Sequence, residues 1–376
     1  MKKIYKYLLI TLLPFIGSCA VVDEPTVTEV SKSDPIAEMV SNYYYSVNPP
    51  TRAYSAPKII STETKHYIID SDSVIETTTT RADDDAFEIT TATLQFKESK
   101  GYAILSRDKR LDKIFFFTEK GCLSDTADIP MLKDYIINIP GMAASEIKSE
   151  KTDTRTSADD VMIYPLVRFH WHQREPFNRY ATTCTCNECA QRGNHRLAGC
   201  VTVATAQAIA TMGKFNGTFY GNRNIDFTQL PAYGFFMNDA QAQTVAQFFH
   251  EVAICCQVEF GCNGSGSTIK AAYQYLKDLG YNCTYEEKEI NVAKLKDELS
   301  KGIPHLIAGR SFESGHMWIV DGLKITGGKT YFNCNWGWGG ASDGWADSYP
   351  FIPNGETDIK NIFSQNIRNI YIYSKL

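Results

Sequence analysis

One cysteine in the chain lies where a thiol can act as a nucleophile. Residues 197–212 read LAGCVTVATAQAIATM, and small or apolar side chains continue for about three turns after Gly199 without proline or glycine. This pattern predicts a buried helix that begins near Cys200. The positive end of the helix macrodipole favours the thiolate, which is the reactive form of cysteine. Free cysteine is also a common core residue, so this segment alone favours a structural role.

A histidine further along the chain can supply the proton transfers that such a thiolate needs. Gly315-His316 directly precedes the apolar run Met317–Val320, which predicts His316 at the start of a strand and at the edge of the core. An imidazole titrates near working pH, so it can take a proton from a thiol and return it to a leaving amine. Taken alone, His316 is more simply interpreted as a hydrogen-bonded structural histidine.

Two further residues could orient and shield this histidine. Asn335 follows a second predicted strand, residues 329–332, and two neighbouring strands would bring Asn335 back beside His316. Its amide oxygen can then accept a hydrogen bond from the imidazole, as the third member of a Cys-His-Asn set. Trp336 can screen that bond from water. The alternative for this tryptophan–glycine run is aromatic packing on tight turns.

A glutamine upstream of the cysteine completes the candidate set. The side-chain NH2 of Gln173 can help bind a developing oxyanion, together with the backbone N–H of Cys200. Glutamine is usually a plain surface residue, so Gln173 gains weight only together with the other three positions.

The composition is that of a globular chain, whose fold must position these residues. The chain has 376 residues, which suggests about two domains of ~150 residues each. Its hydrophobic fraction of 43% and charged fraction of 22% are ordinary globular values and exclude general disorder. A net charge of −5 gives no general attraction for nucleic acid, so we expect no nucleic-acid partner.

The chain divides into two bodies joined by a polar segment. The first is predicted to hold short strands at 93–96, 101–106 and 114–117 and a helix over 131–147. Residues 148–160 have no large apolar side chain, so they form a linker and a plausible proteolytic target. The second body begins near residue 161 and contains all four candidate positions.

The start of the chain predicts export. Residues 1–6 are basic and residues 7–16 are apolar, which fits a signal-peptide core and is too short for a spanning helix. The following Ile16-Gly17-Ser18-Cys19 resembles a bacterial lipobox, in which the cysteine is lipidated. We therefore predict a signal peptide over 1–18 and a membrane anchor at Cys19. The alternative is ordinary signal cleavage, with Cys19 not involved. No later run is apolar enough to span a bilayer.

The count of 11 cysteines also fits an exported chain. Cys184, Cys186 and Cys189, with His195 near, have the ligand types of a zinc site. A second Cys-x2-Cys element is missing, so disulfides are favoured and we expect no metal. Cys255, Cys256, Cys262 and Cys283 are also interpreted as structural, and the sequence does not give the pairing.

The ordered motifs together resemble the streptopain-like cysteine peptidases, the C10 family, which belong to the papain-like fold group. They are Gln173 with Pro176 and Asn178, Ala198-Gly199-Cys200-Val201, Gly315-His316 with Asp321-Gly322, and Asn335-Trp336-Gly337-Trp338-Gly339-Gly340. Ser265-Gly266-Ser267 and, in the first body, residues 101–110 also look like elements of the family. The insertion that carries Cys184 to Cys189 departs from the family pattern.

The resemblance implies an α+β fold, in which a helical part carries the cysteine and an antiparallel sheet part carries the histidine. It implies that Cys200 is the nucleophile, His316 the general base and acid, and Gln173 the oxyanion-hole side chain. Asn335 and Trp336 would orient and screen the histidine. The family cleaves peptide bonds through a thioester acyl-enzyme, often after a hydrophobic residue, and needs no metal or organic cofactor.

The resemblance also implies a latent precursor. Residues 19–155 would form a small α+β pro-segment that inhibits the enzyme and is removed by proteolysis, and residues 156–376 the catalytic domain. We therefore expect an exported lipoprotein of the bacterial cell envelope, with the mature domain on the outer surface or secreted, that acts on proteins or peptides as an endopeptidase. The alternatives are a non-catalytic surface-binding lipoprotein that retains the fold, and a thiol acyltransferase.

Overall fold

A computed structural model describes most of the chain after residue 34. The described residues are 35–48, 55–70, 73–77, 87–149, 160–190, 193–213, 215, 217, 225–310, 315–348 and 367–374. The predicted signal peptide over 1–18, the lipid anchor at Cys19, the domain boundary at 155/156 and most of the predicted linker lie outside them. We call residues 35–149 the N-terminal body and residues 160–374 the C-terminal body.

The strands of both bodies form one sheet. Its described strands number twelve, in the order β2-β1-β3-β4-β5-β11-β10-β9-β8-β12-β7, and β6 pairs separately with β9. All of these pairings are antiparallel. The strands are β1 (Ile59–Asp70), β2 (Ser73–Thr77), β3 (Phe87–Phe96), β4 (Tyr102–Ser106), β5 (Ile114–Thr118), β6 (Val161–Ile163), β7 (Asn282–Glu286), β8 (His305–Arg310), β9 (Gly315–Thr326), β10 (Lys329–Asn335), β11 (Gly344–Asp347) and β12 (Arg368–Ser374).

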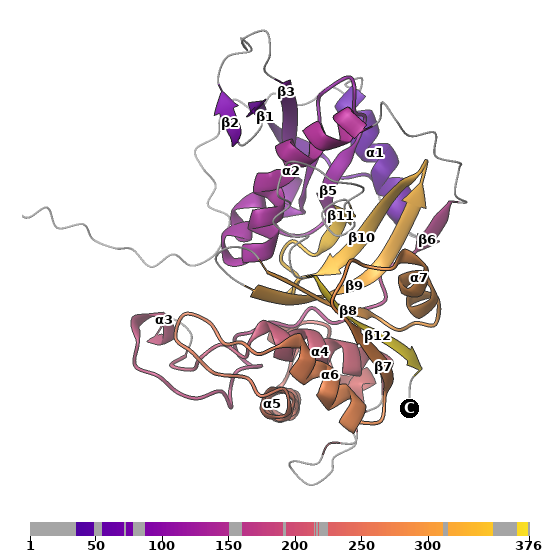
Figure 1. The fold of residues 1–376 in the computed structure, drawn as a ribbon. Coiled ribbons are helices and arrows are strands. Elements are labelled where there is room, and N and C mark those ends of the chain that lie inside the picture. The colour runs from indigo at the N-terminus through magenta and orange to yellow at the C-terminus, as the bar shows by residue number, and fades with distance from the viewer. Residues whose placement is uncertain are drawn as a thin grey trace, which may run out of the picture.

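Helices cover this sheet in separate groups. The helices are α1 (Pro35–Val47), α2 (Pro130–Ser149), α3 (Asn187–Ala190), α4 (Cys200–Met212), α5 (Asp239–Cys255), α6 (Ile269–Asp278) and α7 (Val292–Ser300). In Figure 1, α4, α5 and α6 lie together below β7, β8 and β12, whereas α1 and α2 lie with the N-terminal strands above. No helix among the described residues has the length and apolarity needed to cross a membrane.

The elements predicted from the sequence are confirmed. The three strands expected in the N-terminal body correspond to β3, β4 and β5, and the expected helix corresponds to α2. The mixed fold also agrees with the predicted α+β class, with the cysteine on a helix and the histidine on an antiparallel strand.

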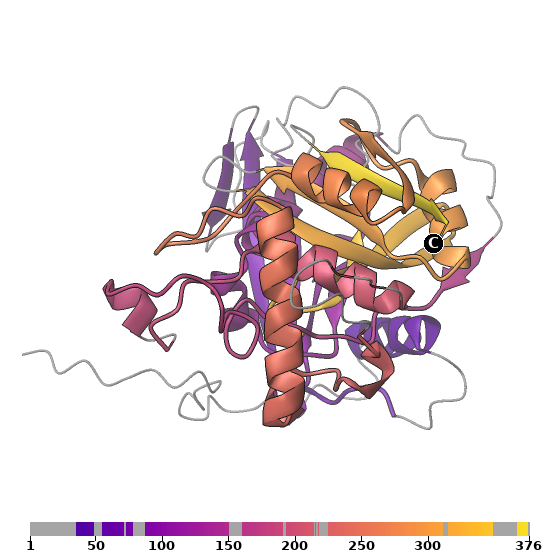
Figure 2. The same cartoon turned by 90° about the horizontal axis from the view of Figure 1, so that it is seen from below.

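Helix α4 is buried on nearly all sides, as its composition predicts. Its alanine, valine and threonine side chains are small, so α5 and the sheet can approach it closely. Figure 2 shows α5 as the long helix that crosses this layer. Along β9, Met317 and Ile319 pack into the α4 cluster, whereas Trp318 and Val320 pack into the cluster that contains α2 and α7. Strand β9 is therefore fixed from both faces.

The two bodies share backbone hydrogen bonds and apolar core. Strand β5 of the N-terminal body pairs with β11 of the C-terminal body, with Phe117 opposite Trp345 and Thr118 opposite Gly344. Tyr135 and Phe116 pack in one cluster with Phe332 of β10. The buried ammonium of Lys113 also pairs with Asp347. The N-terminal body thus covers an apolar face of the C-terminal one.

The contact between β5 and β11 predicts the effect of a small substitution. A Cβ atom at Gly344 would lie 2.4 Å from the Phe117 carbonyl oxygen, so Gly344→Ala must displace one strand. Such overpacking costs about 1–3 kcal/mol. We expect a lower midpoint of urea unfolding for the full chain. Gly264→Ala is the matched control, because a Cβ there meets nothing within 4 Å. Equal midpoints for the two variants would contradict this tight pairing.

Candidate active site

The structure brings Cys200 and His316 together from two different layers. Cys200 is the first residue of α4, and His316 is the second residue of β9. The thiol of Cys200 is hydrogen-bonded to His316 and receives backbone hydrogen bonds from Val201 and Met317. Cys200 remains partly exposed, whereas the His316 side chain is buried. Cys200 is therefore the more exposed residue of the pair.

The turn into α4 requires a glycine. Gly199 adopts a φ of 90°, in the left-handed region that favours glycine, and caps the helix N-terminus. A Cβ atom there would also lie 2.9 Å from the Ser265 carbonyl oxygen. The loop after α5 thus lies directly against the residue that precedes the thiol.

Opposing effects act on the pKa of Cys200. Burial raises the pKa, but the charge of His316 and its hydrogen bond lower it, and the two backbone N–H groups lower it further. The net effect is a pKa below the ordinary thiol value. The pair can thus form a thiolate beside an imidazolium, as cysteine nucleophiles need.

The imidazole is oriented by a backbone carbonyl rather than by the predicted amide. His316 Nε2 donates to the carbonyl oxygen of Trp336 at 2.9 Å, which leaves Nδ1 to exchange a proton with the thiol. The His316 ring also lies parallel to Trp318, with a centroid distance of 6.2 Å. These two contacts fix both the direction and the plane of the ring.

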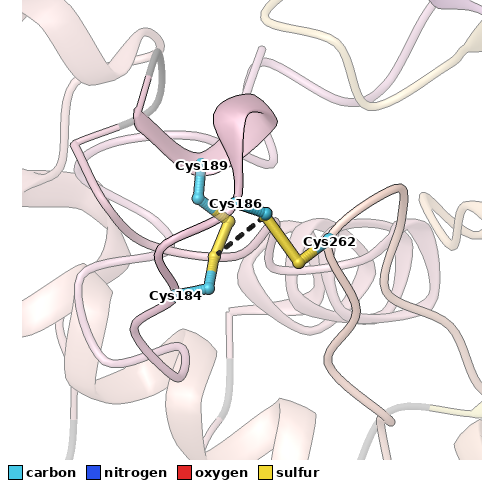
Figure 3. Close-up of side chains that lie close together, drawn as sticks. All are labelled: Cys184, Cys186, Cys189 and Cys262. Atoms are coloured by element: carbon cyan, nitrogen blue, oxygen red, sulfur yellow. Dashed lines mark hydrogen bonds between the residues drawn. A yellow bond between two sulfur atoms is a disulfide. The ribbon is translucent and has the colours of Figure 1, made fainter.

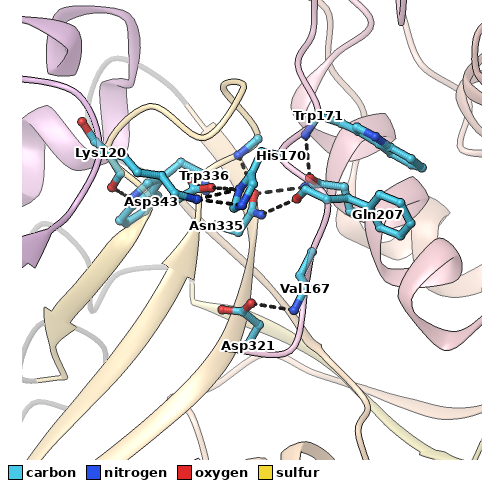
Figure 4. Close-up of polar contacts among 12 residues, drawn as sticks. Lys120, Val167, His170, Trp171, Gln207, Asp321, Asn335, Trp336 and Asp343 are labelled. Atoms are coloured by element: carbon cyan, nitrogen blue, oxygen red, sulfur yellow. Dashed lines mark hydrogen bonds and ion pairs between the residues drawn. The ribbon is translucent and has the colours of Figure 1, made fainter. Parts of the chain in front are cut away.

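The expected hydrogen bond between Asn335 and His316 is wrong. The Asn335 amide instead donates to the Phe169 carbonyl at 3.0 Å, and its oxygen accepts from Gln207 Nε2 and from the Gly337 N–H. Asn335 therefore holds the turn that presents the Trp336 carbonyl. It can act on His316 only through that turn, because its own hydrogen-bonding groups are engaged elsewhere (Figure 4).

Trp336 is buried close to the histidine but does not cover it directly. Its indole packs on Trp318, with centroids 5.5 Å apart, and Trp318 in turn stacks on His316. The indole N–H donates to the Ser342 carbonyl at 3.0 Å. Screening of the histidine thus involves Trp318, which the sequence analysis treated only as a strand residue.

Gln173 lies beside the segment that leads into the nucleophile. Its backbone carbonyl accepts from the Ala198 N–H at 2.9 Å, and the residue is buried. This position is compatible with the predicted oxyanion-hole role, which stays a prediction.

Polar residues missed by the sequence analysis connect this site to the N-terminal body. Lys120 Nζ lies 2.7 Å from His170 Nε2, and His170 Nδ1 lies 2.9 Å from Asp343 (Figure 4). Asp343 also accepts from the backbone N–H of Trp336 at 2.9 Å. A hydrogen-bonded chain thus runs from Lys120 to the residue that orients His316. Of the polar residues that were not predicted, only Gln207 stands out in the sequence, because it is a large polar residue in an otherwise small and apolar helix.

The cysteine cluster lies apart from this site. The expected disulfides are confirmed and pair Cys184 with Cys189 and Cys186 with Cys262. His195 Nδ1 instead contacts the Ala181 carbonyl at 3.0 Å. Three other cysteines that were interpreted as structural, Cys255, Cys256 and Cys283, are free thiols, as is Cys334.

The lowered pKa of Cys200 predicts a distinctive alkylation profile. The rate of reaction of Cys200 with iodoacetamide should rise at a pH below the ordinary thiol pKa, because the thiolate is the reacting form. In His316→Ala the inflection should move above the ordinary value, since burial remains and the compensating charge is lost. Peptide mass spectrometry measures both. Cys255 is the internal control, because burial and Glu251 raise its pKa to about 11. An unchanged inflection in His316→Ala would contradict the pairing.

Comparisons with known proteins show which family the chain resembles. The family model described as the peptidase C10 family matches residues 171–346. Streptopain of Streptococcus pyogenes is 24% identical over 287 residues, which cover 65% of this chain and 70% of streptopain. The thiol protease/hemagglutinin PrtT of Porphyromonas gingivalis is 23% identical over 295 residues, which cover 66% of this chain and 32% of that protein.

A solved structure shares the fold over most of the chain. A fragment of prointerpain A from Prevotella intermedia superposes with a TM-score of 0.58 at 19% sequence identity, and the match covers 76% of this chain and 96% of the fragment. The range of the family match contains both Cys200 and His316. The chain is therefore similar to the C10 family of streptopain-like cysteine peptidases, whose model matches residues 171–346.

Proposed function

We propose that the chain is the precursor of a cysteine endopeptidase, with Cys200 as nucleophile and His316 as general base and acid. The observation that carries this proposal is the contact between the two side chains, together with the lowered pKa of the Cys200 thiol. A cysteine and a histidine serve the same two roles in other thiol peptidases.

The proposed reaction proceeds in two halves. The Cys200 thiolate attacks the carbonyl carbon of the scissile bond, and the C–N bond breaks after His316 gives a proton to the leaving amine. Water, deprotonated by His316, then hydrolyses the thioester and regenerates the thiol. The backbone N–H of Cys200 and the side chain of Gln173 are proposed to bind the oxyanion in both halves. All of these groups belong to the chain, so we propose no cofactor.

We also propose that residues 19–155 are an inhibitory pro-segment. Three contacts support this role: the pairing of β5 with β11, the shared apolar core, and the hydrogen bond between Lys120 and His170. The polar residues 148–160 between the bodies are the proposed cleavage region, because they cannot bury a core of their own. Release of the pro-segment would free the catalytic domain, residues 156–376, to accept protein or peptide substrates.

Export and anchoring belong to the same proposal. The basic and apolar start of the chain and the lipobox-like Ile16-Gly17-Ser18-Cys19 support a signal peptide over 1–18 and lipid attachment at Cys19. The precursor would then be tethered in the bacterial cell envelope, and cleavage of the pro-segment would release the catalytic domain from its anchor.

Self-processing tests the proposed function. The precursor should shorten to a fragment that begins between residues 148 and 161, and a thiol-directed active-site probe should label Cys200. Cys200→Ala should remain full length, since no thioester can form, and His316→Ala should lose turnover by several orders of magnitude. Gel electrophoresis and N-terminal sequencing follow the cleavage.

The control variant is Cys283→Ser, which removes a free thiol outside the site. It should mature and digest casein like the unsubstituted chain. Maturation and casein digestion by Cys200→Ala at the unsubstituted rate would overturn the assignment. Probe labelling without cleavage of any peptide bond would favour acyl transfer instead.

The contact of Lys120 with His170 predicts a change in the rate of maturation. Lys120→Met removes the ammonium that bonds His170 and loosens the hydrogen-bonded chain to Trp336. We expect processing to become about tenfold faster or more, because a charge-assisted hydrogen bond contributes about 1.5–3 kcal/mol. Lys100→Met is the matched control, since Lys100 is exposed and pairs only locally with Glu98. A time course of processing measures both, and equal half-times would show that Lys120 does not restrain the pro-segment.

A further inference from the structure

Four cysteines outside the catalytic site bring their sulfur atoms together. Cys184, Cys186 and Cys189 lie on one loop, and Cys262 lies on the loop after α5 (Figure 3). All four sulfur atoms are within 4.8 Å of one another. Besides the two disulfides of the structure, this cluster therefore has a second possible chemistry, since four convergent thiolates are also a complete ligand set for a metal ion.

Backbone hydrogen bonds hold the three-cysteine loop independently of the sulfur atoms. The N–H groups of Cys189 and Ala190 donate to the Cys186 carbonyl at 3.0 and 3.2 Å, which forms the turn α3. Cys184 N–H donates to the Asn194 carbonyl at 3.0 Å, and Asn194 N–H donates to the Cys189 carbonyl at 2.9 Å. These bonds close the loop, so the three thiols would stay convergent after reduction of the disulfides.

The cluster fits a tetrahedral site with four sulfur ligands. The sulfur atoms of Cys184 and Cys186 lie 3.7 Å apart. Zinc–sulfur bonds of ~2.3 Å place the ligands of a tetrahedral site roughly 3.8 Å apart. His195, the further ligand type near these cysteines in the sequence, contacts the Ala181 carbonyl instead, and Cys262 takes its place in the cluster. Soft thiolate ligands without oxygen donors select zinc among the divalent ions that need no redox chemistry.

The cysteine cluster joins two loops close to the nucleophile. Cys262 holds the loop whose Ser265 carbonyl lies against Gly199, the residue before the nucleophile. Arg196 supports the same loop by donating to the Phe260 carbonyl at 2.8 Å. A link between the two loops therefore fixes the surroundings of the Cys200 N–H.

Reducing conditions would favour a metal over disulfides for this link. Cys200 must be a thiol to react, and Cys255 and Cys283 of the same body are also free thiols. A reductant that keeps Cys200 active also opens disulfides by thiol–disulfide exchange. A zinc–thiolate link contains no S–S bond to be opened, so it would persist under those conditions.

We propose that Cys184, Cys186, Cys189 and Cys262 of the reduced chain bind one Zn²⁺ as a structural tetrathiolate site. Formation from the disulfide state consumes two equivalents of a dithiol, each of which gives two electrons and two protons and becomes a disulfide. Zinc then displaces the protons of the four thiols. No coordination position stays open, so the ion links the loops and takes no part in peptide cleavage.

Cobalt substitution tests the site without any measurement of peptidase activity. The full chain carrying Cys200→Ala, which cannot process itself, is reduced with a phosphine under anaerobic conditions and titrated with Co²⁺. We expect a thiolate-to-cobalt charge-transfer band that saturates at one Co²⁺ per chain and disappears on addition of Zn²⁺. Cys262→Ser should weaken metal binding at least about tenfold. Cys283→Ser, the matched control at a free buried cysteine, should bind within about twofold of its parent.

A second measurement needs no substitution in the cluster. Zinc should protect the four cysteines of the reduced chain from alkylation, while the slow alkylation of Cys255 should not change with zinc, as read by peptide mass spectrometry. Absence of the charge-transfer band, the same band in Cys262→Ser, or alkylation of the four cysteines at equal rates with and without zinc would each overturn the proposal. None of these outcomes bears on Cys200 and His316, so the two proposals fail separately.

Discussion

The contact between Cys200 and His316 is the constraint on which the rest of the structure depends. A thiol that is largely removed from water resists ionisation, so its pKa falls only if an imidazole is held against it. The two residues come from a helix and a strand of different layers, and neither layer fixes the distance alone. The tight packing of α4 against β9 and the burial of β9 on both faces set that distance.

The histidine is held by a carbonyl whose own position depends on a polar network. Asn335, Gln207 and Asp343 each bond a group in the turn that begins at Asn335, so the turn cannot move without loss of several buried hydrogen bonds. Removal of one partner from such a network leaves others unsatisfied, which is costly in a low-dielectric interior. The amide of Asn335 is thus important to the site although it does not touch the imidazole.

The same network explains how the N-terminal body can be coupled to the reactive centre at a distance. Lys120 bonds His170, and His170 bonds Asp343, which accepts from the Trp336 N–H. The carbonyl of the same Trp336 accepts from His316. The continuous sheet keeps Lys120 in register, because β5 and β11 share backbone hydrogen bonds next to it. Inhibition and catalytic geometry would then rest on one set of contacts.

The sequence by itself determined several elements, among them α4 and β9, and the reactive pair, and the tertiary structure decided their partners. A glycine, a cysteine and a run of small residues specify the start of α4 locally, and an apolar run after His316 specifies β9 in the same way. The carbonyl that orients His316, the bonds of Asn335, the role of Lys120 and the convergence of Cys262 with Cys184 were not predictable. Each joins segments far apart in the chain, so it depends on how the layers pack rather than on any local pattern.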